Sequence, residues 1–406
     1  GADVSAPVAE ILRAVQERGD AALREYTLRF DGAAPDALAV TAEEVDQAAA
    51  QVEPAFLAVL EEAAEHIRAY HARQKRESFV MTEREGVVLG QRIIPLARVG
   101  IYVPGGTAAY PSTVLMNAIP ARIAGVGEII MVTPPGRDGA VNPHILAAAK
   151  IAGVTRIYKV GGAQAVAALA YGTGTIPQVD KIVGPGNAYV AEAKRQVFGR
   201  VNIDMIAGPS EVLVLADGRS NPAWVAADLL SQAEHDRMAA AVLVTDSRPL
   251  AEAVAHELER QLAALPRAEI ARASLEANGK LIVCRDLREG IAVANRIAPE
   301  HLELCVDNPF DYLGEIQNAG SVFLGRYNPE PMGDYFAGPN HTLPTMGTAR
   351  FYSPLSVDDF VKKSQFSYYT RDALARDYRK VSLFARKEGL DAHARAVDIR
   401  FEGGEA

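Results

Sequence analysis

Two adjacent ionisable residues, Glu300 and His301, are the first candidates for chemistry in this chain. They stand in the segment Ala298-Pro-Glu-His-Leu-Glu, just before an apolar run, where a loop entering a strand could direct both side chains into a cleft. Histidine titrates near neutral pH, and partial burial can raise a carboxyl pKa toward that range, so the pair suits general acid–base catalysis. The alternative is a solvated charged turn, which this fragment by itself favours.

A second group of residues could bind a metal ion. Gln232 and His235 are three positions apart in Ser231-Gln-Ala-Glu-His-Asp, which would place them on one face of a helix. Zinc accepts imidazole nitrogen and carboxylate oxygen readily, whereas a glutamine carbonyl is a rarer ligand. The two residues alone are therefore a weak indication of a metal site.

Further polar residues stand near the C-terminus. Asp334 and His341 lie in a glycine-rich stretch that predicts a long loop, and loops of this kind usually serve a site. Glu388 and His393 lie in a charged helical stretch, where solvent-facing polar residues are the ordinary interpretation. The sharper hypothesis is a terminal arm that reaches another chain.

Two glycine-containing turns could face a ligand with their backbone N–H groups. Tyr102-Val-Pro-Gly-Gly106 and Val183-Gly-Pro-Gly-Asn187 each follow a predicted strand and precede a predicted helix. The second turn lacks the third glycine of G-x-G-x-x-G, so the usual dinucleotide fingerprint is not supported. Tight strand-to-helix turns without a ligand remain the alternative for both.

Length and composition limit the class of protein. The chain has 406 residues, 49% of them hydrophobic and 23% charged, which predicts two main domains with large buried cores. Its net charge of −9 argues against nucleic acid as a partner. Cys284 and Cys305 suggest neither a disulfide framework nor a thiolate metal site, and a reducing cytosol fits. No apolar run reaches the length of about 20 residues that a membrane helix needs, so we expect a soluble cytoplasmic protein that is not exported.

The elements that must position these residues follow an α/β pattern. Helices are predicted from Val8 to about Gln74, with a capping box at Thr41 and Glu44, and a hairpin is predicted over 78–94. Short apolar runs then alternate with helical stretches, which indicates βα units and mainly parallel sheets. The runs 302–306 and 321–324 show no helical pattern between them, so the second sheet is expected to be mixed. Beyond Pro354 the chain is predicted to be helical.

Taken together, these segments resemble the histidinol dehydrogenase family from Val4 to Val397. The resemblance rests on the order and spacing of six motifs, which are Gly100-Ile-Tyr-Val-Pro-Gly-Gly, Val183-Gly-Pro-Gly-Asn-Ala, Ala207-Gly-Pro-Ser-Glu, Ser231-Gln-Ala-Glu-His-Asp, Ala298-Pro-Glu-His-Leu-Glu and Gly338-Pro-Asn-His-Thr-Leu-Pro-Thr. The start of the chain is shorter than is usual in the family, which leaves the packing of the dimer at that end open.

The resemblance implies a role for each of these residues. Glu300 and His301 match the family's catalytic pair. The zinc ligands, one ion per subunit, would be Gln232, His235, Asp334 and His393, with His393 coming from the second subunit. The cofactor NAD would contact Tyr102, Gln164 and Asn187. The substrate would be held by Ser210, Gln232, His235, His301, Asp334, His341, Glu388 and His393.

The resemblance also implies an activity and an architecture. The family oxidises L-histidinol to L-histidine through bound L-histidinal, with two hydride transfers to two NAD molecules; His301 would remove the alcohol proton and Glu300 would activate water. The expected fold is two Rossmann-like (incomplete) α/β domains with small helical N- and C-terminal extensions. The expected divisions are 1–20 as a helical segment, 21–100 plus 211–355 as the metal and catalytic domain, 101–210 as the NAD domain, and 356–406 as a helical tail reaching the partner of a homodimer.

Three other functions remain open at this point. A related NAD-dependent dehydrogenase of another small alcohol would use the same scaffold and the same catalytic pair. A zinc hydrolase would use Glu300 or His301 to activate metal-bound water and would form no NADH. A non-catalytic metal-binding protein would leave the acid–base pair without a purpose.

Overall fold

The computed structural model describes residues 3–105 and 109–403, which fall into two compact units. The first unit comprises Gly1–Lys75 and Leu96–Phe360, and the second comprises Arg76–Pro95 and Val361–Ala406. Gly106, which ends the predicted 102–106 turn, lies outside the described residues. Among the helices of the described part, none combines the length and apolar character needed to cross a bilayer.

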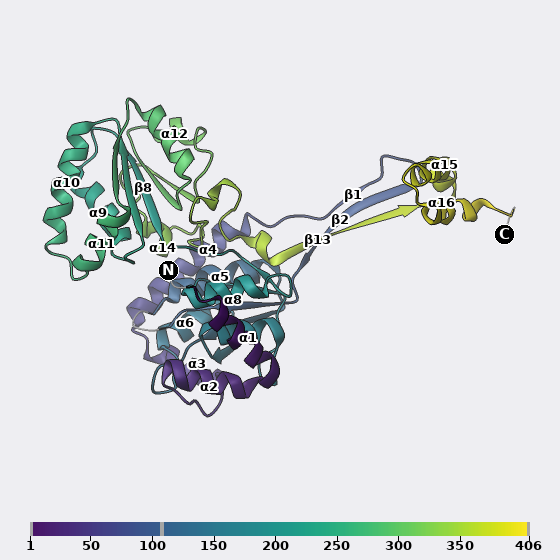
Figure 1. The fold of residues 1–406 in the computed structure, drawn as a ribbon, viewed down its shortest axis with the longest axis horizontal. Helices are drawn as coiled ribbons and strands as arrows, with labels where there is room; N and C mark the ends of the chain where they lie inside the picture. Colours follow the sequence, from purple (N-terminus) through teal and green to yellow (C-terminus); the bar gives the residue numbers. More distant parts are fainter. Residues whose placement is uncertain (1–2, 106–108, 404–406) are drawn as a thin grey trace. The chain divides into compact units, whose positions relative to one another are not determined.

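The first unit contains two five-stranded sheets, each with helices on both faces (Figure 1). In the first sheet the strand order is β5-β4-β3-β6-β7 and every pairing is parallel. Its strands are β3 (Arg98–Tyr102), β4 (Glu128–Thr133), β5 (Arg156–Lys159), β6 (Lys181–Val183) and β7 (Asn202–Ile203). The helices that follow them are α5 (Pro111–Ala124), α6 (Pro143–Ala152), α7 (Gly162–Tyr171) and α8 (Ala188–Val197).

The N-terminal helices pack on this same sheet. They are α1 (Ser5–Arg18), α2 (Asp20–Asp31), α3 (Ala42–Gln51) and α4 (Pro54–Ala72). Leu23 of α2 shares a core with Ile130, whereas Ile67 of α4 shares the opposite core with Ile129, because neighbouring residues of strand β4 point to opposite faces. The predicted capping box at the start of α3 is present. The expected grouping of 21–100 with 211–355 therefore differs from the packing, since residues 21–72 bury their apolar side chains against β3–β6.

The second sheet has the order β10-β9-β8-β11-β12, which repeats the topology of the first. Its strands are β8 (Glu211–Ala216), β9 (Ala240–Thr245), β10 (Lys280–Val283), β11 (His301–Cys305) and β12 (Ser321–Leu324). The helices around it are α9 (Pro222–Ala233), α10 (Arg248–Leu262), α11 (Ala268–Asn278), α12 (Leu287–Ile297), α13 (Phe310–Leu313) and α14 (Pro331–Tyr335). The prediction of a mixed sheet is wrong, because β11 and β12 pair in parallel and the short α13 forms part of the crossover between them.

Buried apolar side chains explain why the strands of the second sheet read as nearly continuous hydrophobic runs. Val212 and Val214 of β8 pack with α9 and α10, whereas Leu213 and Leu215 pack with α12 on the other face. Both faces of a parallel sheet are covered by its crossover helices, so alternate residues have no solvent to face. The predicted α/β class with two Rossmann-like domains is confirmed.

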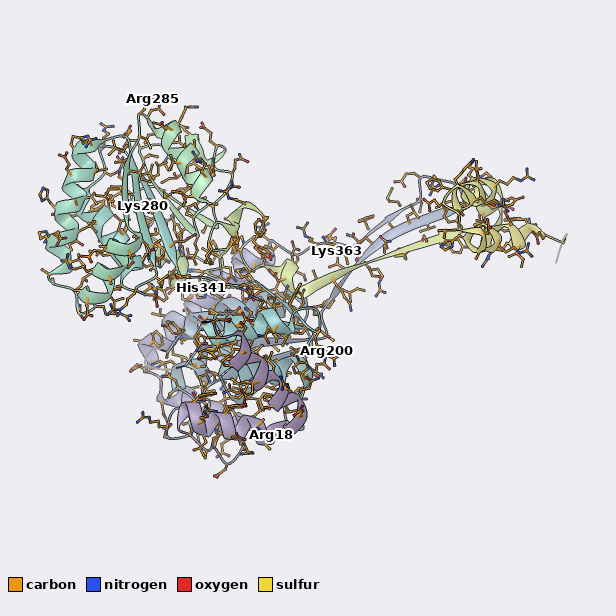
Figure 2. The ribbon with its side chains drawn as sticks, viewed as in Figure 1. Arg18, Arg200, Lys280, Arg285, His341 and Lys363 are labelled. Carbon is orange, nitrogen blue, oxygen red and sulfur yellow. The ribbon has the colours of Figure 1, made fainter. Side chains whose placement is uncertain are left out.

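The second unit is a three-stranded antiparallel sheet followed by two helices. The sheet has the order β1-β2-β13, with β1 (Phe79–Met81), β2 (Val87–Pro95) and β13 (Val361–Tyr369), and the helices are α15 (Arg371–Lys387) and α16 (Asp391–Asp398). Phe366 of β13 lies over Gly90, where a Cβ atom would come within 2.1 Å of its ring. The strands carry exposed charged side chains such as Lys363 (Figure 2). The tail predicted as helical over 356–406 therefore contains a nine-residue strand ahead of its helices.

Short 3-10 helices complete the described chain. They are η1 (Thr348–Arg350), η2 (Val357–Phe360) and η3 (Ile399–Phe401). Phe360 of η2 is fully buried and joins the core formed by α4, α5 and the first sheet. It closes the first unit immediately before β13 begins.

Candidate active site

Glu300 and His301 lie where helix α12 gives way to strand β11. The helix ends at Ile297, and Ala298 takes the left-handed conformation (φ 52°), which redirects the chain through Pro299 into the strand. His301 is the first residue of β11, between β8 and β12. The Glu300 and His301 side chains are only 9% and 5% exposed. A solvated charged turn does not describe this pair.

The ring of His301 has one defined hydrogen-bond partner. Its Nδ1 lies 2.9 Å from the backbone oxygen of Glu211, and because a carbonyl oxygen only accepts, Nδ1 must carry the proton and donate it. The lone pair of the neutral ring is then on Nε2, which lies 3.2 Å from Oε1 of Glu330. Burial lowers the pKa of His301, while the carboxylate of Asp334 opposes that shift. The ring is therefore held neutral with Nε2 as a proton acceptor.

Glu300 is held by reciprocal hydrogen bonds with Glu211. Its Oε2 accepts the backbone N–H of Glu211 at 2.9 Å, and its own N–H donates to Oε1 of Glu211 at 3.0 Å. Burial raises the pKa of Glu300 well above its usual value, and the negative charges of Glu211 and Asp334 raise it further. The hydrogen bond from the backbone of Glu211 lowers this pKa but does not cancel the effect of burial. A carboxylate with a raised pKa is a stronger base, so Glu300 is suited to deprotonating a water molecule.

Gln232 presents a buried oxygen that lacks a partner. The residue lies on α9 and is 1% exposed, and its Oε1 makes no hydrogen bond. A buried acceptor without a partner costs about 1–3 kcal/mol, which a bound cation would offset. His235 donates its backbone N–H to the Gln232 carbonyl at 3.1 Å, but α9 ends at Ala233. The two residues are thus joined by a turn. The shared helical face that their spacing predicted is not present.

Asp334 on α14 lies at the centre of the remaining polar groups. The carboxylate of Asp334, the ring of His301 and the carboxyl group of Glu330 offer ligand atoms within 4.8 Å of one another. Burial and the nearby carboxylate of Asp334 together raise the pKa of Glu330 to about 10. His341 (Figure 2) has its Nδ1 3.1 Å from the Asp334 carbonyl, and burial lowers the pKa of that imidazole. His341 and His235 both influence the pKa of His301. The donors gathered here are nitrogen and oxygen, which zinc accepts.

The other predicted substrate residues fall in both units. Ser210 immediately precedes β8, and the β8–β11 register, which pairs Val212 with His301, places it at the same sheet end as Glu300 and His301. Glu388 follows α15 and His393 lies on α16 in the second unit, and both are exposed. The first unit thus contains every predicted site residue except these two.

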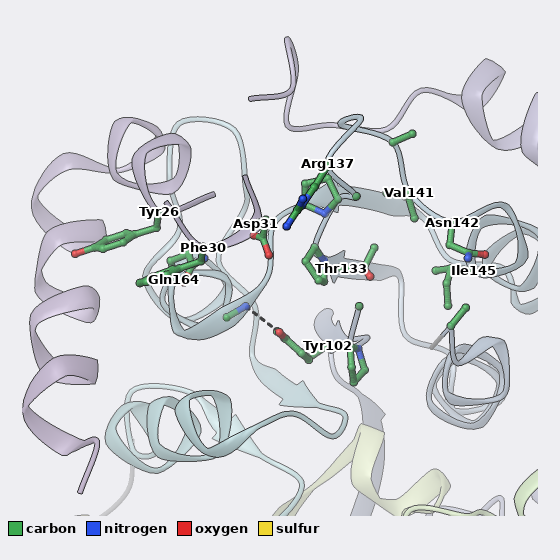
Figure 3. A pocket seen from close by; sticks show the side chains of 18 of the residues that line it. Tyr26, Phe30, Asp31, Tyr102, Thr133, Arg137, Val141, Asn142, Ile145 and Gln164 are labelled. Atoms are coloured by element: carbon green, nitrogen blue, oxygen red, sulfur yellow. Dashed lines mark hydrogen bonds between the residues drawn. The ribbon is translucent and has the colours of Figure 1, made fainter. Parts of the chain in front are cut away.

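The three predicted NAD contacts line one cavity of about 1460 Å³ (Figure 3). The hydroxyl of Tyr102 accepts the N–H of Gly162 at 2.8 Å, where α7 begins, and Gln164 in the same helix has a buried Oε1 without a partner. Asn187 also lines the cavity while its side chain caps α8. A cavity of this size with unsatisfied polar atoms is suited to a large polar ligand.

A buried ion pair holds the turn that carries Asn187. Gly184 donates its N–H to the Asp204 carboxylate at 2.9 Å, and its carbonyl accepts from Nζ of Lys194 at 2.9 Å. Asp204 and Lys194 form an ion pair of 2.5 Å, and their side chains are 1% and 4% exposed. Gly184 has φ 114°, and a Cβ atom there would lie 2.2 Å from the oxygen of Tyr102. The pair thus pins the turn against Tyr102.

Comparison with known proteins assigns the chain to a family. The family model described as histidinol dehydrogenase matches residues 1–401. The chain belongs to the histidinol dehydrogenase family. Curated relatives named histidinol dehydrogenase from Geobacillus kaustophilus and Listeria monocytogenes are 58% and 56% identical over 398 and 399 residues, covering 98% of this chain and 94% and 93% of theirs. The resemblance seen in the sequence is confirmed.

Solved structures agree with the family. Histidinol dehydrogenase from Elizabethkingia anophelis has a TM-score of 0.95 with 41% identity and covers 99% of this chain and 93% of that one. A betaine aldehyde dehydrogenase from Staphylococcus aureus is similar with a TM-score of 0.51 and 11% identity, covering 91% of this chain and 84% of that one. The second likeness concerns the fold alone.

Sequence reasoning missed two acidic residues of the candidate site. Glu211 makes hydrogen bonds to both Glu300 and His301, and the available signal was its place directly after Ser210 at the start of a predicted strand. Glu330 faces Nε2 of His301 and is 2% exposed. Its signal was an acidic residue four positions before Asp334, the spacing of one helical turn.

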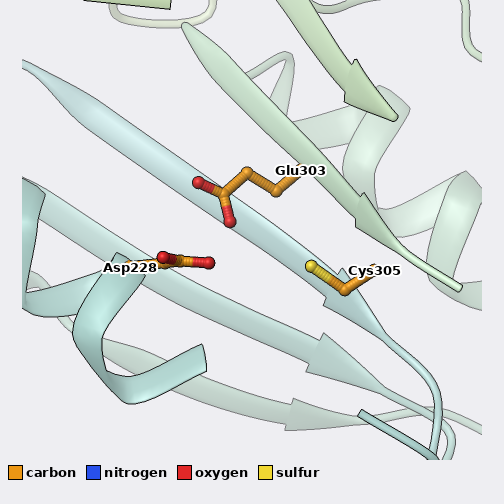
Figure 4. A group of neighbouring side chains, drawn as sticks. All are labelled: Asp228, Glu303 and Cys305. Atoms are coloured by element: carbon orange, nitrogen blue, oxygen red, sulfur yellow. The ribbon is translucent and has the colours of Figure 1, made fainter. Parts of the chain in front are cut away.

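Two further acidic side chains, the partly buried Asp228 and the buried Glu303, lie together with Cys305 (Figure 4). Glu303 follows His301 by two residues on β11, and Asp228 precedes Gln232 by one turn of α9. Burial and Asp228 raise the pKa of Glu303 to about 9, and burial raises the pKa of Asp228. Oε2 of Glu303 has no donor partner unless one of the two carboxyl groups keeps its proton. We infer that the pair shares one proton at neutral pH.

Glu303 also has a structural role. Oε1 of Glu303 accepts the N–H of Glu330 at 2.9 Å, which anchors the chain just before α14. Cys305 lies in the same cluster, with ligand atoms of all three residues within 4.8 Å of one another. Burial raises the pKa of its thiol, so no thiolate is offered to a metal ion. The cluster therefore links α9 to the segment that carries Asp334.

Replacing Glu303 with glutamine is expected to make stability less dependent on pH. The folded-state pKa of about 9 lies above the ordinary 4.5, so stability falls as pH rises through that interval and the carboxyl group loses its proton. Glutamine keeps the acceptor for Glu330 without titrating. Between about pH 6 and pH 9 the thermal midpoint of the wild type should therefore drop at least about 2 °C more than that of Glu303→Gln. Parallel curves, as expected for the exposed control Glu276→Gln, would contradict the shared proton.

Proposed function

We propose that this chain is a zinc-dependent L-histidinol dehydrogenase that oxidises L-histidinol to L-histidine with two molecules of NAD. The observation that carries the proposal is the buried His301, whose Nδ1 is committed to a backbone carbonyl and whose Nε2 faces the groups around Asp334. The names of the close relatives support the substrate.

The acid–base steps follow from the two buried side chains. His301 would take the proton of the alcohol on Nε2, because Nδ1 already carries its own proton toward Glu211. Glu300 would then deprotonate water for attack on the aldehyde, and its hydrogen bonds to Glu211 keep its carboxyl group in place. NAD supplies the hydride acceptor in each oxidation. Tyr102, Gln164 and Asn187 would hold this cofactor in their common cavity.

The ligand donors fit a divalent metal ion that anchors the substrate. Gln232, His235 and Asp334 of one subunit and His393 of the partner subunit would hold zinc, and the unpartnered Oε1 of Gln232 supports this set. Zinc would supply coordination of the imidazole and amine nitrogens of histidinol. Ser210, His341 and Glu388 would complete the substrate contacts.

The exposure of Glu388 and His393 supports a homodimer with a shared site. Both are exposed in the second unit, close in sequence to apolar side chains that are also exposed, among them Phe384 at 70% and Leu383 at 60%. Exposed apolar groups of this kind mark a protein interface. A cytoplasmic location, and the absence of membrane and nucleic acid partners, remain predictions from the sequence.

Mixing two inactive variants tests the shared site. Asp334→Ala and His393→Ala should each lose nearly all activity, but unfolded together and refolded they should recover about a quarter of the wild-type rate, because half of the dimers are mixed and carry one intact site. His256→Ala, which changes an exposed histidine on α10, should behave as wild type. No recovery on mixing, with dimers present, would place His393 in the site of its own chain.

NADH formation tests the activity itself. The purified protein with zinc is expected to reduce two NAD per L-histidinol and to prefer it over other small alcohols, and chelation should abolish the rate until zinc is returned. A strong preference for another alcohol would support the related dehydrogenase. Hydrolysis of esters or amides without NADH would support the zinc hydrolase.

A further inference from the structure

Asp31 is an acidic residue in the cofactor cavity that the proposed chemistry does not use. It is the last residue of α2 and lines the same cavity as Tyr102 and Gln164 (Figure 3). Its Oδ2 is buried and makes no hydrogen bond, and among the described residues no cation forms an ion pair with it. The carboxylate lies close enough to add to the raised pKa of Tyr102.

Folding gains nothing from a carboxylate at this position. Burial raises the pKa of Asp31 to about 6, which shows that its surroundings disfavour the charge. The C-terminal end of a helix carries partial negative charge, so an acidic last residue is unfavourable there as well. A buried polar atom left without a partner in a cavity is what a ligand donor would satisfy.

The part of the dinucleotide that reaches Asp31 follows from the position of the chemistry. The proposed chemistry puts hydride transfer beside His301 on the second sheet, so the nicotinamide would lie toward that sheet. The cavity wall formed by α2 packs on the first sheet and is left for the adenosine portion. Phe30, next to Asp31, is 52% exposed, and its ring, stacked on that of Tyr26 at 5.6 Å, adds an aromatic group to the cavity wall.

We propose that Asp31 selects the cofactor, accepting hydrogen bonds from the vicinal hydroxyls of the adenosine ribose and repelling a 2′-phosphate. The inference rests on the proposed use of NAD. A carboxylate suits an unphosphorylated ribose because both hydroxyls donate to it, whereas a phosphate brings like charge. Arg29 and Arg137 line the same cavity, so Asp31 also offsets cations that would otherwise favour the phosphate.

The test compares NAD with NADP in Asp31→Asn. Dissociation constants for both dinucleotides are measured by calorimetry, and kcat/KM is measured with L-histidinol. The variant should bind NAD about 10- to 100-fold more weakly, and its preference for NAD over NADP should fall by at least about 10-fold. The matched control is Asp36→Asn, which removes an exposed carboxylate five residues away, outside the cavity, and should keep the wild-type preference.

The stability of the unliganded protein separates recognition from a structural role. Asp31→Asn without ligand should melt at the same temperature as the wild type or higher, because a buried charge has been removed. A lower melting temperature with an unchanged preference for NAD would overturn the proposal. The proposal would also be overturned if Asp31→Asn kept its preference for NAD over NADP but discriminated less well against the hypoxanthine analogue of NAD, because Asp31 would then bind the base. A wild type that neither binds nor reduces NAD would refute the proposed function itself.

Discussion

Replacing His301 with asparagine is expected to lower kcat for L-histidinol by about 10²–10⁴-fold, the usual contribution of a general base. The asparagine amide can still donate to the carbonyl of Glu211, as Nδ1 does, so the local structure should survive. What disappears is the lone pair of Nε2. The loss should fall on kcat, while the dissociation constants for zinc and NAD stay within a few-fold of wild type.

The pH profile distinguishes a missing base from a disturbed site. His301 would act as a base in its neutral form, so the wild-type rate should rise as the ring loses its proton and then level off. Because burial lowers the pKa of this ring, the plateau should be reached at a lower pH than for an ordinary histidine. Without the base, the rate of His301→Asn should continue to rise at alkaline pH as the alcohol itself ionises. His256→Asn, at an exposed position, serves as the control. A variant that keeps full turnover would show that another group is the base.

The second large effect is expected from Glu300→Gln, and it should be confined to the oxidation of the aldehyde. Glutamine keeps an acceptor for the N–H of Glu211 but cannot take a proton from water. The first oxidation should remain within about 10-fold of wild type, and the oxidation of L-histidinal should fall by about 10²–10⁴-fold. Rapid mixing with L-histidinol should then show one NADH per site formed quickly and the second slowly.

Two further measurements make this prediction specific. The raised pKa of Glu300 means that its basic form is populated only at higher pH, so aldehyde oxidation by the wild type should rise with pH over a range above that of an ordinary carboxyl group. Glu276→Gln, on the exposed surface of α11, is the control for the same substitution. Equal losses with L-histidinol and L-histidinal would show that Glu300 acts in both steps or maintains the site.

The local features of the fold were predictable because they depend on neighbouring residues. Periodic apolar side chains indicated the helices and the βα alternation, and the spacing of Thr41 and Glu44 indicated a cap that the structure contains. The hairpin predicted over 78–94 is also present, with β1 and β2 antiparallel. Strand β13 was missed because its pairing with β2 joins residues far apart in the sequence.

What the sequence by itself determined was the α/β class and the family, and it named Glu300 and His301 as candidates for acid–base chemistry. Which sheet the N-terminal helices cover, and whether β12 is parallel to β11, depended on distant burial and on the crossover, which no local pattern records. The same holds for the site. Only the tertiary structure shows that the carbonyl of Glu211 commits Nδ1 of His301, and that Gln232 and Asp31 have buried oxygens without partners. Adjacency in sequence names candidates, whereas tautomer, burial and hydrogen bonding depend on groups that folding brings together from afar.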